Sequence, residues 1–303
     1  MATSRGTTEA GLACIVLVNW NGWRDTAACL ESCAGLHYAH VHTIVVDNGS
    51  TDDSVARLRE RFPELHLLEM GANLGFAGGS NAGIHSALAL GADYIWLLNN
   101  DTVVDPGALD ALVEVMVEHP SVGIAGSRIL YLDRPDTLWF AGGFFSRPWG
   151  LATHRGADET DEGQYGSLAD ADFVSGCSLF ARASAARVIG PLDERYFLYW
   201  EDVDWSVRAR LAGLRVVYVP GSRVLHKLGA SMPVADGRIK WRYEGRNRLL
   251  FYRRHCPAGV PRILLTTLLN AGHLAALGRL GDCLELLHGA FDGVRSGSGQ
   301  LRS

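Results

Sequence analysis

Two neighbouring carboxylates, Glu201 and Asp202, follow an apolar and aromatic run at residues 196–200. A carboxylate packed against such side chains is poorly solvated, which raises its pKa and suits it to act as a general base. Acids in the first turn of a helix can also do no more than stabilise the helix dipole. Asp204 can pair with Arg208 one turn later, which predicts a structural role for Asp204. We therefore assign Asp202 as the candidate base, near the start of a helix.

A second group of residues could bind a metal ion. Asn99 and Asp101 stand at alternate positions after an apolar run, and such oxygen ligands suit Mg²⁺ or Mn²⁺ bridging a diphosphate. A simple Asn-Asp turn without a ligand is the alternative. His226 follows a later apolar run and is a candidate third ligand, although a single histidine beside a strand can be purely structural.

The elements that position these residues are apolar runs alternating with helical patterns. The expected strands cover residues 12–18, 43–46, 65–70 and 94–98, and the expected helices cover 24–36, 52–61 and the stretch that leads to residue 90. Buried strands alternating with helices predict an α/β fold with a mainly parallel sheet covered on both faces. In such sheets ligands bind beyond the carboxyl ends of the strands.

Polar turns at that edge offer the chemistry of a nucleotide pocket. Asn19, Asn21 and Asp47 can exchange hydrogen bonds with a base and a ribose, and the glycines within 75–79 allow close backbone approach to a phosphate at a helix start. No G-x-G-x-x-G fingerprint follows the first strand, and the G-x-x-x-x-G-K-[ST] loop does not occur. The sequence therefore disfavours an NAD-dependent oxidoreductase and a P-loop NTPase.

Composition limits the class of protein. The 303 residues are 48% hydrophobic and 20% charged, as in a globular protein with a large core. The net charge of −5 argues against a general nucleic-acid binder, which needs a basic surface. Six cysteines without a C-x-x-C pair predict reduced thiols rather than zinc sites or disulfides. Because no apolar stretch reaches the ~18 residues of a membrane span and segment 1–11 lacks a signal-peptide core, we expect a soluble or peripheral cytoplasmic protein.

The ordered set of motifs resembles the inverting family 2 glycosyltransferases with the GT-A fold, especially their bacterial rhamnosyltransferase-like branch. One motif alone would be a weak signal, but all of them occur in the family's order between residues 12 and 231. The matching stretches are 18–22, 45–52, 73–81, 97–102, 173–177 and 197–210, together with His226.

The resemblance implies that Asp101 binds the metal ion with His226 and that Asp202, beside Glu201, is the catalytic base. The nucleotide-sugar-binding residues would be Asn19, Asn21, Asp47, Asn73, Gly79, Asn81, Asn99 and Asn100, with Asp47 on the base of the nucleotide. The residues placed on the acceptor side are Gly176, Cys177 and Trp200. Asn99 stands where many members have Asp. We therefore expect the metal ion to bind more weakly, and we expect its binding to depend more strongly on bound diphosphate.

The implied reaction is a metal-dependent single displacement that inverts the anomeric carbon. Rhamnose from dTDP-rhamnose is the favoured sugar, and the acceptor is a hydroxyl of a glycan or lipid-linked glycan in cell-envelope polysaccharide synthesis. Galactofuranose, glucose or N-acetylglucosamine on UDP stay open as donors. A sugar nucleotidyltransferase would need a glycine-rich basic loop that residues 19–22 lack. A non-catalytic nucleotide-sugar-binding scaffold is the other alternative, disfavoured by Asp101, Asp202 and His226.

Changes in composition predict the organisation of the chain. We expect a flexible segment 1–11, a catalytic domain 12–232 divided into a nucleotide-sugar half 12–105 and an acceptor half 106–232, a helical region 233–295 and a disordered tail 296–303. Within the acceptor half, residues 140–164 are expected to form a mobile loop.

The expected helix at 238–254 combines seven basic side chains with aromatic ones, although the whole chain is negatively charged. Such a cluster can bind anionic lipid headgroups, which predicts peripheral attachment to the inner face of the cytoplasmic membrane. Ordinary helix packing and a homodimer contact are the alternatives. Residues 263–287 are expected to form one further helix.

Overall fold

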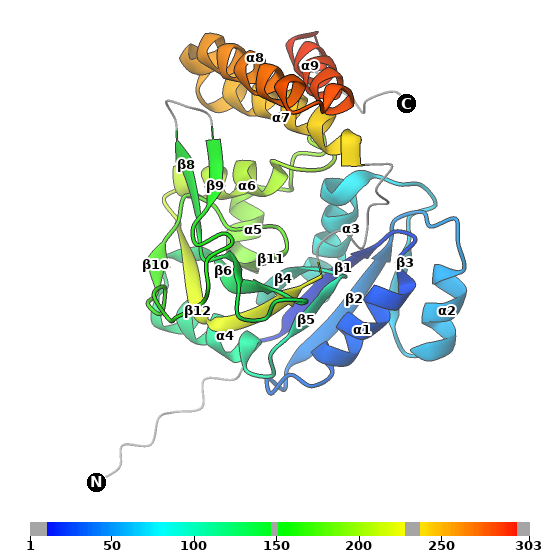
Figure 1. Ribbon diagram of the computed structural model, residues 1–303. Coiled ribbons are helices and arrows are strands. Elements are labelled where there is room, and N and C mark those ends of the chain that lie inside the picture. The colour runs from blue at the N-terminus through cyan, green and yellow to red at the C-terminus, as the bar shows by residue number, and fades with distance from the viewer. Residues whose placement is uncertain (1–10, 147–150, 228–236, 296–303) are drawn as a thin grey trace.

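The computed structural model describes residues 11–146, 151–227 and 237–295. Residues 1–10 of the expected flexible segment, the expected tail at 296–303 and the expected domain boundary near residue 233 lie outside these ranges. A single large sheet forms the centre of the molecule, and the C-terminal helices stack at one end of it (Figure 1).

The first half of the chain forms the parallel part of the sheet. Its strands are β1 (Ala13–Asn19), β2 (Val41–Asp47), β3 (His66–Glu69) and β4 (Tyr94–Asn99). They pair in the order β4-β1-β2-β3. Each of the four apolar runs in the sequence is a strand, so the predicted α/β fold is confirmed.

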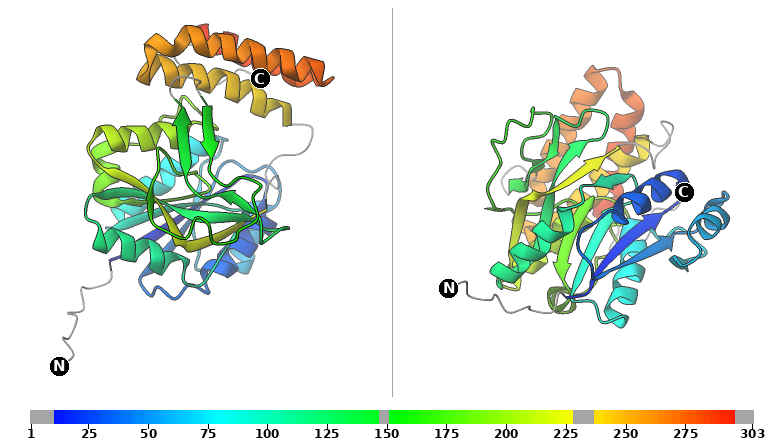
Figure 2. Two further views of the ribbon diagram at one scale, coloured as in Figure 1. Left: turned by 60° about the vertical axis from the view of Figure 1, so that its left-hand side comes forward. Right: turned by 90° about the horizontal axis from the view of Figure 1, so that it is seen from below.

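Helices cover both faces of this parallel part. Right-handed crossovers place α1 (Trp23–Cys33) and α2 (Ser54–Arg61) on one face and α3 (Gly75–Ala89) on the other (Figure 2). The α3 helix packs closely on β1: a Cβ atom at Gly79 would lie 2.8 Å from Val18 Cγ1, and one at Gly83 would lie 2.1 Å from Val16 Cγ1. These two glycines, one helical turn apart, let the helix approach the strand.

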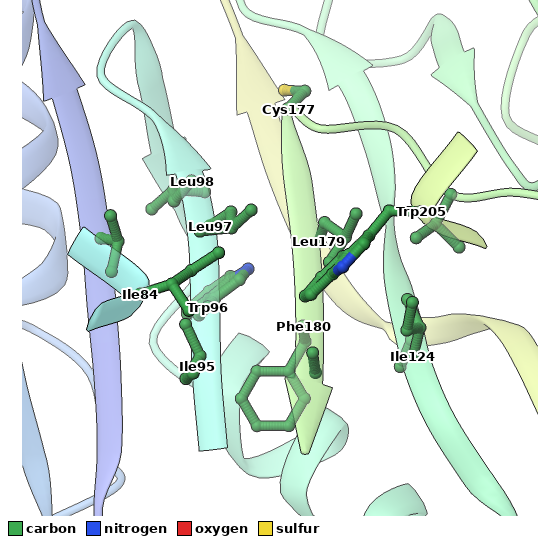
Figure 3. Packing of buried hydrophobic residues seen from close by; sticks show 14 of the residues in the cluster. Ile84, Ile95, Trp96, Leu97, Leu98, Ile124, Cys177, Leu179, Phe180 and Trp205 are labelled. Carbon is green, nitrogen blue, oxygen red and sulfur yellow. The ribbon is translucent and has the colours of Figure 1, made fainter. Parts of the chain in front are cut away.

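The second half of the chain adds strands of mixed direction. They are β5 (Thr102–Val104), β6 (Val122–Tyr131), β7 (Leu138–Phe140), β10 (Ala169–Asp170), β11 (Ser178–Arg182) and β12 (Arg215–His226). β11 lies between β4 and β6 and is antiparallel to both, so it joins the two halves of the sheet. Figure 3 shows Leu97 of β4 and Leu179 of β11 side by side in the core, with Trp205 next to them.

Three helices belong to this second half: α4 (Ala108–Glu118), α5 (Ala183–Ile189) and α6 (Glu201–Leu211). The acidic helix α6 begins at Glu201, because Phe197, Tyr199 and Trp200 just before it have left-handed backbone conformations, with φ of 62°, 68° and 76°. The aromatic run therefore forms an irregular loop that leads into the helix.

The segment expected to be a mobile loop at 140–164 contains a β-hairpin. Strands β8 (Gly143–Ser146) and β9 (Leu151–His154) pair antiparallel. Phe145 holds the hairpin in place, because its ring packs against those of Trp200 and Phe251 at centroid distances of 6.4 and 5.0 Å. The expectation of a mobile loop is therefore wrong for these strands.

The C-terminal elements are α7 (Gly237–His255), a 3₁₀ turn (Pro257–Gly259), α8 (Val260–Ala276) and α9 (Leu280–Arg295). The single helix expected at 263–287 is wrong, because Gly278 has a φ of 74° just after α8 and the chain turns there. Within the described ranges, no helix combines the length and the apolar character needed to cross a membrane.

Two basic side chains of α7 and several of its aromatic ones are interior, whereas Arg238, Lys240, Arg253 and Arg254 are exposed. Arg246 is 1% exposed and Arg248 3% exposed, and Tyr243, Phe251 and Tyr252 are buried as well. These residues pack against the catalytic part and against α9 rather than facing solvent. For them the predicted lipid-binding role is wrong, and helix packing, the stated alternative, applies.

Candidate active site

Strand pairing brings Asp101 and His226 together although they are far apart in the sequence. β5 and β12 are antiparallel neighbours, and Thr102 lies opposite His226 in their register. Asp101 directly precedes Thr102, so its carboxylate lies beside the imidazole. The distance from Asp101 Oδ1 to His226 Nε2 is 3.2 Å, and both side chains are buried.

The Asp101–His226 pair fits the role of a partial metal site. Asp101 Oδ1 and His226 Nδ1 are buried without a hydrogen-bond partner, so both side chains keep capacity for a further ligand. Neighbouring ligands of an octahedral Mg²⁺ or Mn²⁺ ion lie about 3 Å apart, close to the observed 3.2 Å. Asn99 at the end of β4 is partly exposed. In the described ranges no three His, Cys, Asp or Glu side chains form a complete site, so the remaining ligands would come from bound molecules.

The protonation of His226 depends on its two neighbours. Burial lowers the pKa of His226, but Cys177 and the Asp101 carboxylate more than offset this and raise the pKa above that of an ordinary histidine. Burial also raises the pKa of the Cys177 thiol, so Asp101 is the anion that acts on His226 at neutral pH. All six cysteines are free, which confirms the expectation of reduced thiols.

Two aromatic side chains that the sequence motifs did not reveal surround His226. Trp139 of β7 packs edge-on against His226, with ring centroids 4.9 Å apart, and against His154 of β9, with centroids 4.7 Å apart. Burial lowers the pKa of His154 to about 4, so this ring is neutral at neutral pH. No pattern in the sequence marks Trp139 and His154, because only the hairpin that follows β7 brings them to the site.

Asp202 lies in the first turn of α6 and is held by two backbone groups. Its Oδ2 accepts a hydrogen bond from Gly176 N–H and its Oδ1 one from Val203 N–H, each at 2.8 Å. Burial raises the pKa of Asp202, although these two hydrogen bonds oppose the shift. The residue as a whole is partly exposed. A carboxylate with a raised pKa has the properties of a general base.

The dipeptide Gly176–Cys177 connects Asp202 to the Asp101–His226 pair. The backbone of Gly176 binds Asp202, and the next side chain, Cys177, interacts with the ring of His226. A Cβ atom on Gly176 would lie 3.6 Å from Asp202 Oδ2, so the glycine leaves room beside the carboxylate. The structure therefore brings together three candidates, Asp202, Asp101 and His226, around the two residues placed on the acceptor side.

Glu201, the other acid of the candidate catalytic pair, has a different environment. It is 4% exposed, and its Oε2 has no hydrogen-bond partner. Burial raises the pKa of Glu201 well above its ordinary value, and the adjacent charge of Asp202 adds to the shift. A buried acid that retains its proton does not accept one from a substrate, so its environment favours Asp202 as the base.

Replacing Glu201 by Gln tests this difference. A carboxyl group whose pKa is higher in the folded state stabilises the fold below its unfolded pKa of about 4.3, and this contribution is lost as the pH rises through the folded pKa. Glutamine has no such proton to lose. We therefore expect Glu201→Gln to gain stability relative to the wild type as the pH rises from about 4 to about 8. Melting temperatures across this range check the trend, and a constant difference between the two proteins would contradict it.

A buried network ties together the turns after β1 and β2. Asn19 Nδ2 donates to Asp47 Oδ2 at 2.8 Å and to Ser50 Oγ at 3.1 Å. Thr26 Oγ1 donates to Asn19 Oδ1 at 2.8 Å and accepts a hydrogen bond from Asn100 Nδ2 at 2.9 Å. Asn19 and Asp47 are almost fully buried, so their first role is to organise this edge of the sheet. The base contact of Asp47 stays a prediction.

Two further amide side chains join neighbouring turns. Asn21 Oδ1 accepts a hydrogen bond from Thr51 N–H at 2.8 Å. Asn48 Nδ2 donates to Asn73 Oδ1 at 3.1 Å and to the carbonyl of Gly75 at 2.9 Å, which links the end of β2 to the start of α3. Asn48 was not among the candidates, although it stands in the same polar turn as several of them.

Two residues assigned to nucleotide-sugar binding have other roles. Gly79 lies against Val18 in the contact between α3 and β1. Asn81 Nδ2 donates to Leu192 O and Glu194 Oε1, each at 3.0 Å, and Asn81 Oδ1 accepts from Leu192 N–H at 2.9 Å. These groups are engaged inside the protein, so both residues have a packing role, and their part in nucleotide-sugar binding stays a prediction.

Trp200 and Asp204 serve the packing around α6. The indole Nε1 of Trp200 donates to Glu244 Oε2 of α7 at 3.0 Å, and the side chain is 5% exposed, so its place on the acceptor side stays a prediction. Asp204 is fully buried and accepts a hydrogen bond from Arg208 Nε at 2.7 Å. The predicted structural role of Asp204 is confirmed.

Comparison with known proteins places this site in a family. Residues 14–188, more than half of the chain, match glycosyl transferase family 2. The chain is 32% identical over 209 residues to the N-acetylglucosaminyl-diphospho-decaprenol L-rhamnosyltransferase of Mycobacterium tuberculosis, covering 61% of this chain and 66% of that protein. It is 30% identical over 260 residues to a galactofuranosyltransferase of Mycolicibacterium smegmatis, covering 81% and 82%. The chain thus spans about two thirds of the length of the first relative.

Solved structures agree on the fold. A mannosyltransferase from Pyrobaculum calidifontis, solved with GDP-Man and Mn²⁺, superposes with a TM-score of 0.60 at 13% identity, covering 95% of this chain and 88% of that one. GalNAc-T7, solved with UDP, GalNAc and Mn²⁺, gives a TM-score of 0.59 at 14% identity, covering 81% and 50%. The family assignment favours a glycosyltransferase over a sugar nucleotidyltransferase. The chain belongs to glycosyl transferase family 2 and is a glycosyltransferase with the GT-A fold.

Proposed function

We propose that this chain is an inverting glycosyltransferase in which Asp202 is the catalytic base and Asp101 and His226 bind Mg²⁺ or Mn²⁺. The observation that supports this proposal is the link through Gly176 and Cys177. It holds a carboxylate with a raised pKa next to a buried carboxylate–imidazole pair that has unused ligand capacity.

The residues divide the reaction between them. Asp202 accepts the proton of an acceptor hydroxyl while the hydroxyl oxygen forms a bond to the anomeric carbon. The bond from that carbon to the diphosphate oxygen breaks, and its electron pair leaves with the nucleoside diphosphate, so the configuration inverts. A divalent cation at Asp101 and His226 supplies positive charge for the departing diphosphate. Trp139 packs against His226 and limits access of water to that side.

For the donor and the acceptor we propose dTDP-rhamnose and a lipid-linked glycan of the cell envelope. One relative is named for transfer of L-rhamnose to N-acetylglucosaminyl-diphospho-decaprenol, and another, from Shigella flexneri, is named a dTDP-rhamnosyl transferase, 24% identical over 228 residues. The galactofuranosyltransferase relatives make UDP-galactofuranose the competing donor.

A panel of nucleotide sugars tests this proposal. A ligand that binds only the folded protein raises its melting temperature, so dTDP-rhamnose with Mn²⁺ is expected to give the largest shift. Release of dTDP in the presence of a lipid-linked acceptor then measures transfer. A shift and release with UDP-galactofuranose alone would reject the rhamnose donor, and the absence of both with every donor would reject the activity.

The C-terminal helices expose an apolar surface, which we call the α8–α9 face. Its side chains lie on the sides of α8 and α9 away from buried Ile263 and Leu286, and they are Leu265, Leu268, Leu269, Leu277, Leu280, Leu284, Phe291 and Val294. Exposed Arg238 lies beside Gly281, and exposed Arg295 lies over the ring of Phe291, 5.0 Å from its centroid, so basic side chains flank the face. Because apolar side chains flanked by basic ones suit an anionic bilayer, we propose that this face attaches the protein to the inner face of the cytoplasmic membrane.

Vesicle sedimentation tests the α8–α9 face. Leu268 and Leu284 are 59% and 55% exposed, so replacing both by Glu is expected to leave the fold intact and to abolish binding to anionic phospholipid vesicles at low salt. Val188→Glu, at a 70% exposed position on α5, is the matched control and should bind like the wild type. Wild-type protein that stays in the supernatant would reject the membrane role, and a concentration-dependent dimer would assign the face to a second copy of this chain.

A further inference from the structure

The loop that leads into α6 has an unusual backbone. Phe197, Tyr199 and Trp200 all have positive φ, and none of them is glycine. Such a conformation is unfavourable for residues other than glycine and persists only where the surroundings enforce it. The loop ends two residues before Asp202, so whatever enforces its shape also determines where the candidate base stands.

A single side chain of α7 binds three carbonyl groups of this loop. Asn247 Nδ2 lies 2.8 Å from each of the carbonyl oxygens of Tyr196, Leu198 and Tyr199, and its two N–H groups donate to these three acceptors, so that one N–H is shared. Asn247 is fully buried. A loop with this backbone cannot satisfy its carbonyl groups through a regular helix or strand, and a buried carbonyl without a partner is costly. The amide of Asn247 therefore supplies the hydrogen bonds that the carbonyl groups of this left-handed loop cannot form within the loop itself.

Neighbouring side chains on the same side of α7 support this contact. The ring of Tyr243, one helical turn before Asn247, stacks on Phe197 with centroids 5.4 Å apart and an interplanar angle of 11°. Glu244 accepts the hydrogen bond from Trp200 Nε1 at 3.0 Å. All five residues of the loop 196–200 are thus contacted by α7, which lies outside the part of the chain that matches the family model.

We propose that Asn247 is a positioning residue: by holding the loop 196–200 it keeps Asp202 against Gly176 N–H and directed toward the acceptor. This inference rests on the proposed role of Asp202 as the base. It makes α7 part of the catalytic apparatus rather than an appendage of the catalytic domain. Asn247 acts through the loop backbone and does not touch the substrate.

Replacing Asn247 by Asp or by Ala removes the amide donor, and Asp does so with almost no change of shape. We expect kcat to fall about 10²-fold, since a small misplacement of a reacting group has effects of this size, while the KM for the donor stays unchanged. Backbone amides of residues 197–204 should exchange hydrogen for deuterium faster than in the wild type. Asn247→Gln keeps the donor and should recover kcat relative to Asn247→Asp.

Thr267→Val in α8 is the matched control for lost stability. Thr267 is 1% exposed and donates to the carbonyl of Ile263 in its own helix at 2.8 Å, so its replacement removes a buried hydrogen bond away from the loop. It should lower the melting temperature but leave kcat and exchange at 197–204 unchanged. Asn247 variants that behave like this control would overturn the proposal.

The exchange measurement also separates this inference from the proposed function. If the wild type releases no nucleoside diphosphate with any donor, the proposed function fails, yet unchanged exchange at 197–204 in the Asn247 variants still rejects the positioning role. If the wild type is active and the Asn247→Asp variant transfers sugar at the wild-type rate, only the positioning role is rejected.

Discussion

Asp202→Asn is expected to abolish sugar transfer while the nucleoside diphosphate sugar still binds. Asparagine keeps the shape of the side chain but does not accept a proton at neutral pH, so the hydroxyl of the acceptor attacks without being deprotonated. Loss of a general base lowers kcat by about 10²- to 10⁴-fold. Initial rates at saturating substrates measure this loss, and calorimetric titration with the donor measures the retained binding.

The contacts of Asp202 dictate the controls for this experiment. Both of its oxygens accept backbone hydrogen bonds, from Gly176 and Val203, so the amide group of an asparagine would face one N–H donor with another. Such a mismatch costs about 1–3 kcal/mol, and a melting curve of the variant shows its size. Glu201→Gln is the matched control, because it makes the same acid-to-amide change at the adjacent position. Near wild-type turnover in Asp202→Asn would show that the base is misassigned.

The pH dependence of kcat in the wild type is a second test of Asp202 as the base. Burial raises the pKa of Asp202, so the base becomes protonated at a higher pH than an ordinary aspartic acid. We expect kcat to fall as the pH drops through this raised pKa and the residual rate of Asp202→Asn to lack that acid limb. If kcat of the wild type and of Asp202→Asn falls in the same way at low pH, the group that titrates there is not Asp202.

Asp101→Asn is expected to have the next largest effect, on the requirement for metal. The variant keeps an oxygen ligand but loses the negative charge beside His226. Changes in the groups around metal ligands already cost about 10- to 100-fold in metal affinity, so loss of a ligand's charge should raise the half-activating Mn²⁺ concentration at least that much. Titration of Mn²⁺ into chelator-treated enzyme, with activity as the readout, measures this change.

A nearby acid provides the control for the metal experiment. Asp105 pairs with Arg223 at 3.3 Å on the partly exposed side of the same segment, so Asp105→Asn should leave the Mn²⁺ requirement unchanged. Calorimetry of Mn²⁺ with nucleoside diphosphate present reports binding without catalysis. Equal Mn²⁺ affinities for the wild type and Asp101→Asn would remove Asp101 from the metal site.

The parallel half of the sheet could be predicted because each of its strands is marked by a continuous apolar run in the sequence. The apolar runs at 12–18, 43–46, 65–70 and 94–98 became β1 to β4; β1 and β4 are buried almost throughout and therefore need apolar side chains on both faces, whereas β3 is the partly exposed edge strand. The order of the motifs was specific enough to indicate the family before any fold was known. The pairing of Asp204 with Arg208 was predictable because it spans one helical turn.

The parts that could not be predicted depend on contacts between distant segments. The three left-handed residues before α6 look like an ordinary aromatic run, and only Asn247 from α7 makes their conformation tenable. The basic residues of α7 suggested a lipid-binding surface, whereas packing against α9 buries Arg246. Asn81 was assigned to ligand binding because no residue near it in the sequence indicates that Leu192, 111 residues later, is its hydrogen-bond partner.

The central position of β11 has a consequence for how the chain is made. During synthesis β4 and β6 leave the ribosome before residues 178–182, and β12, the other neighbour of β6, follows later still. Unpaired strand edges are sites where other chains attach and aggregate. A nascent chain that ends between β6 and β11 therefore carries open edges on β4 and on both sides of most of β6, so the interval between residues 131 and 178 is the one in which such attachment is favoured.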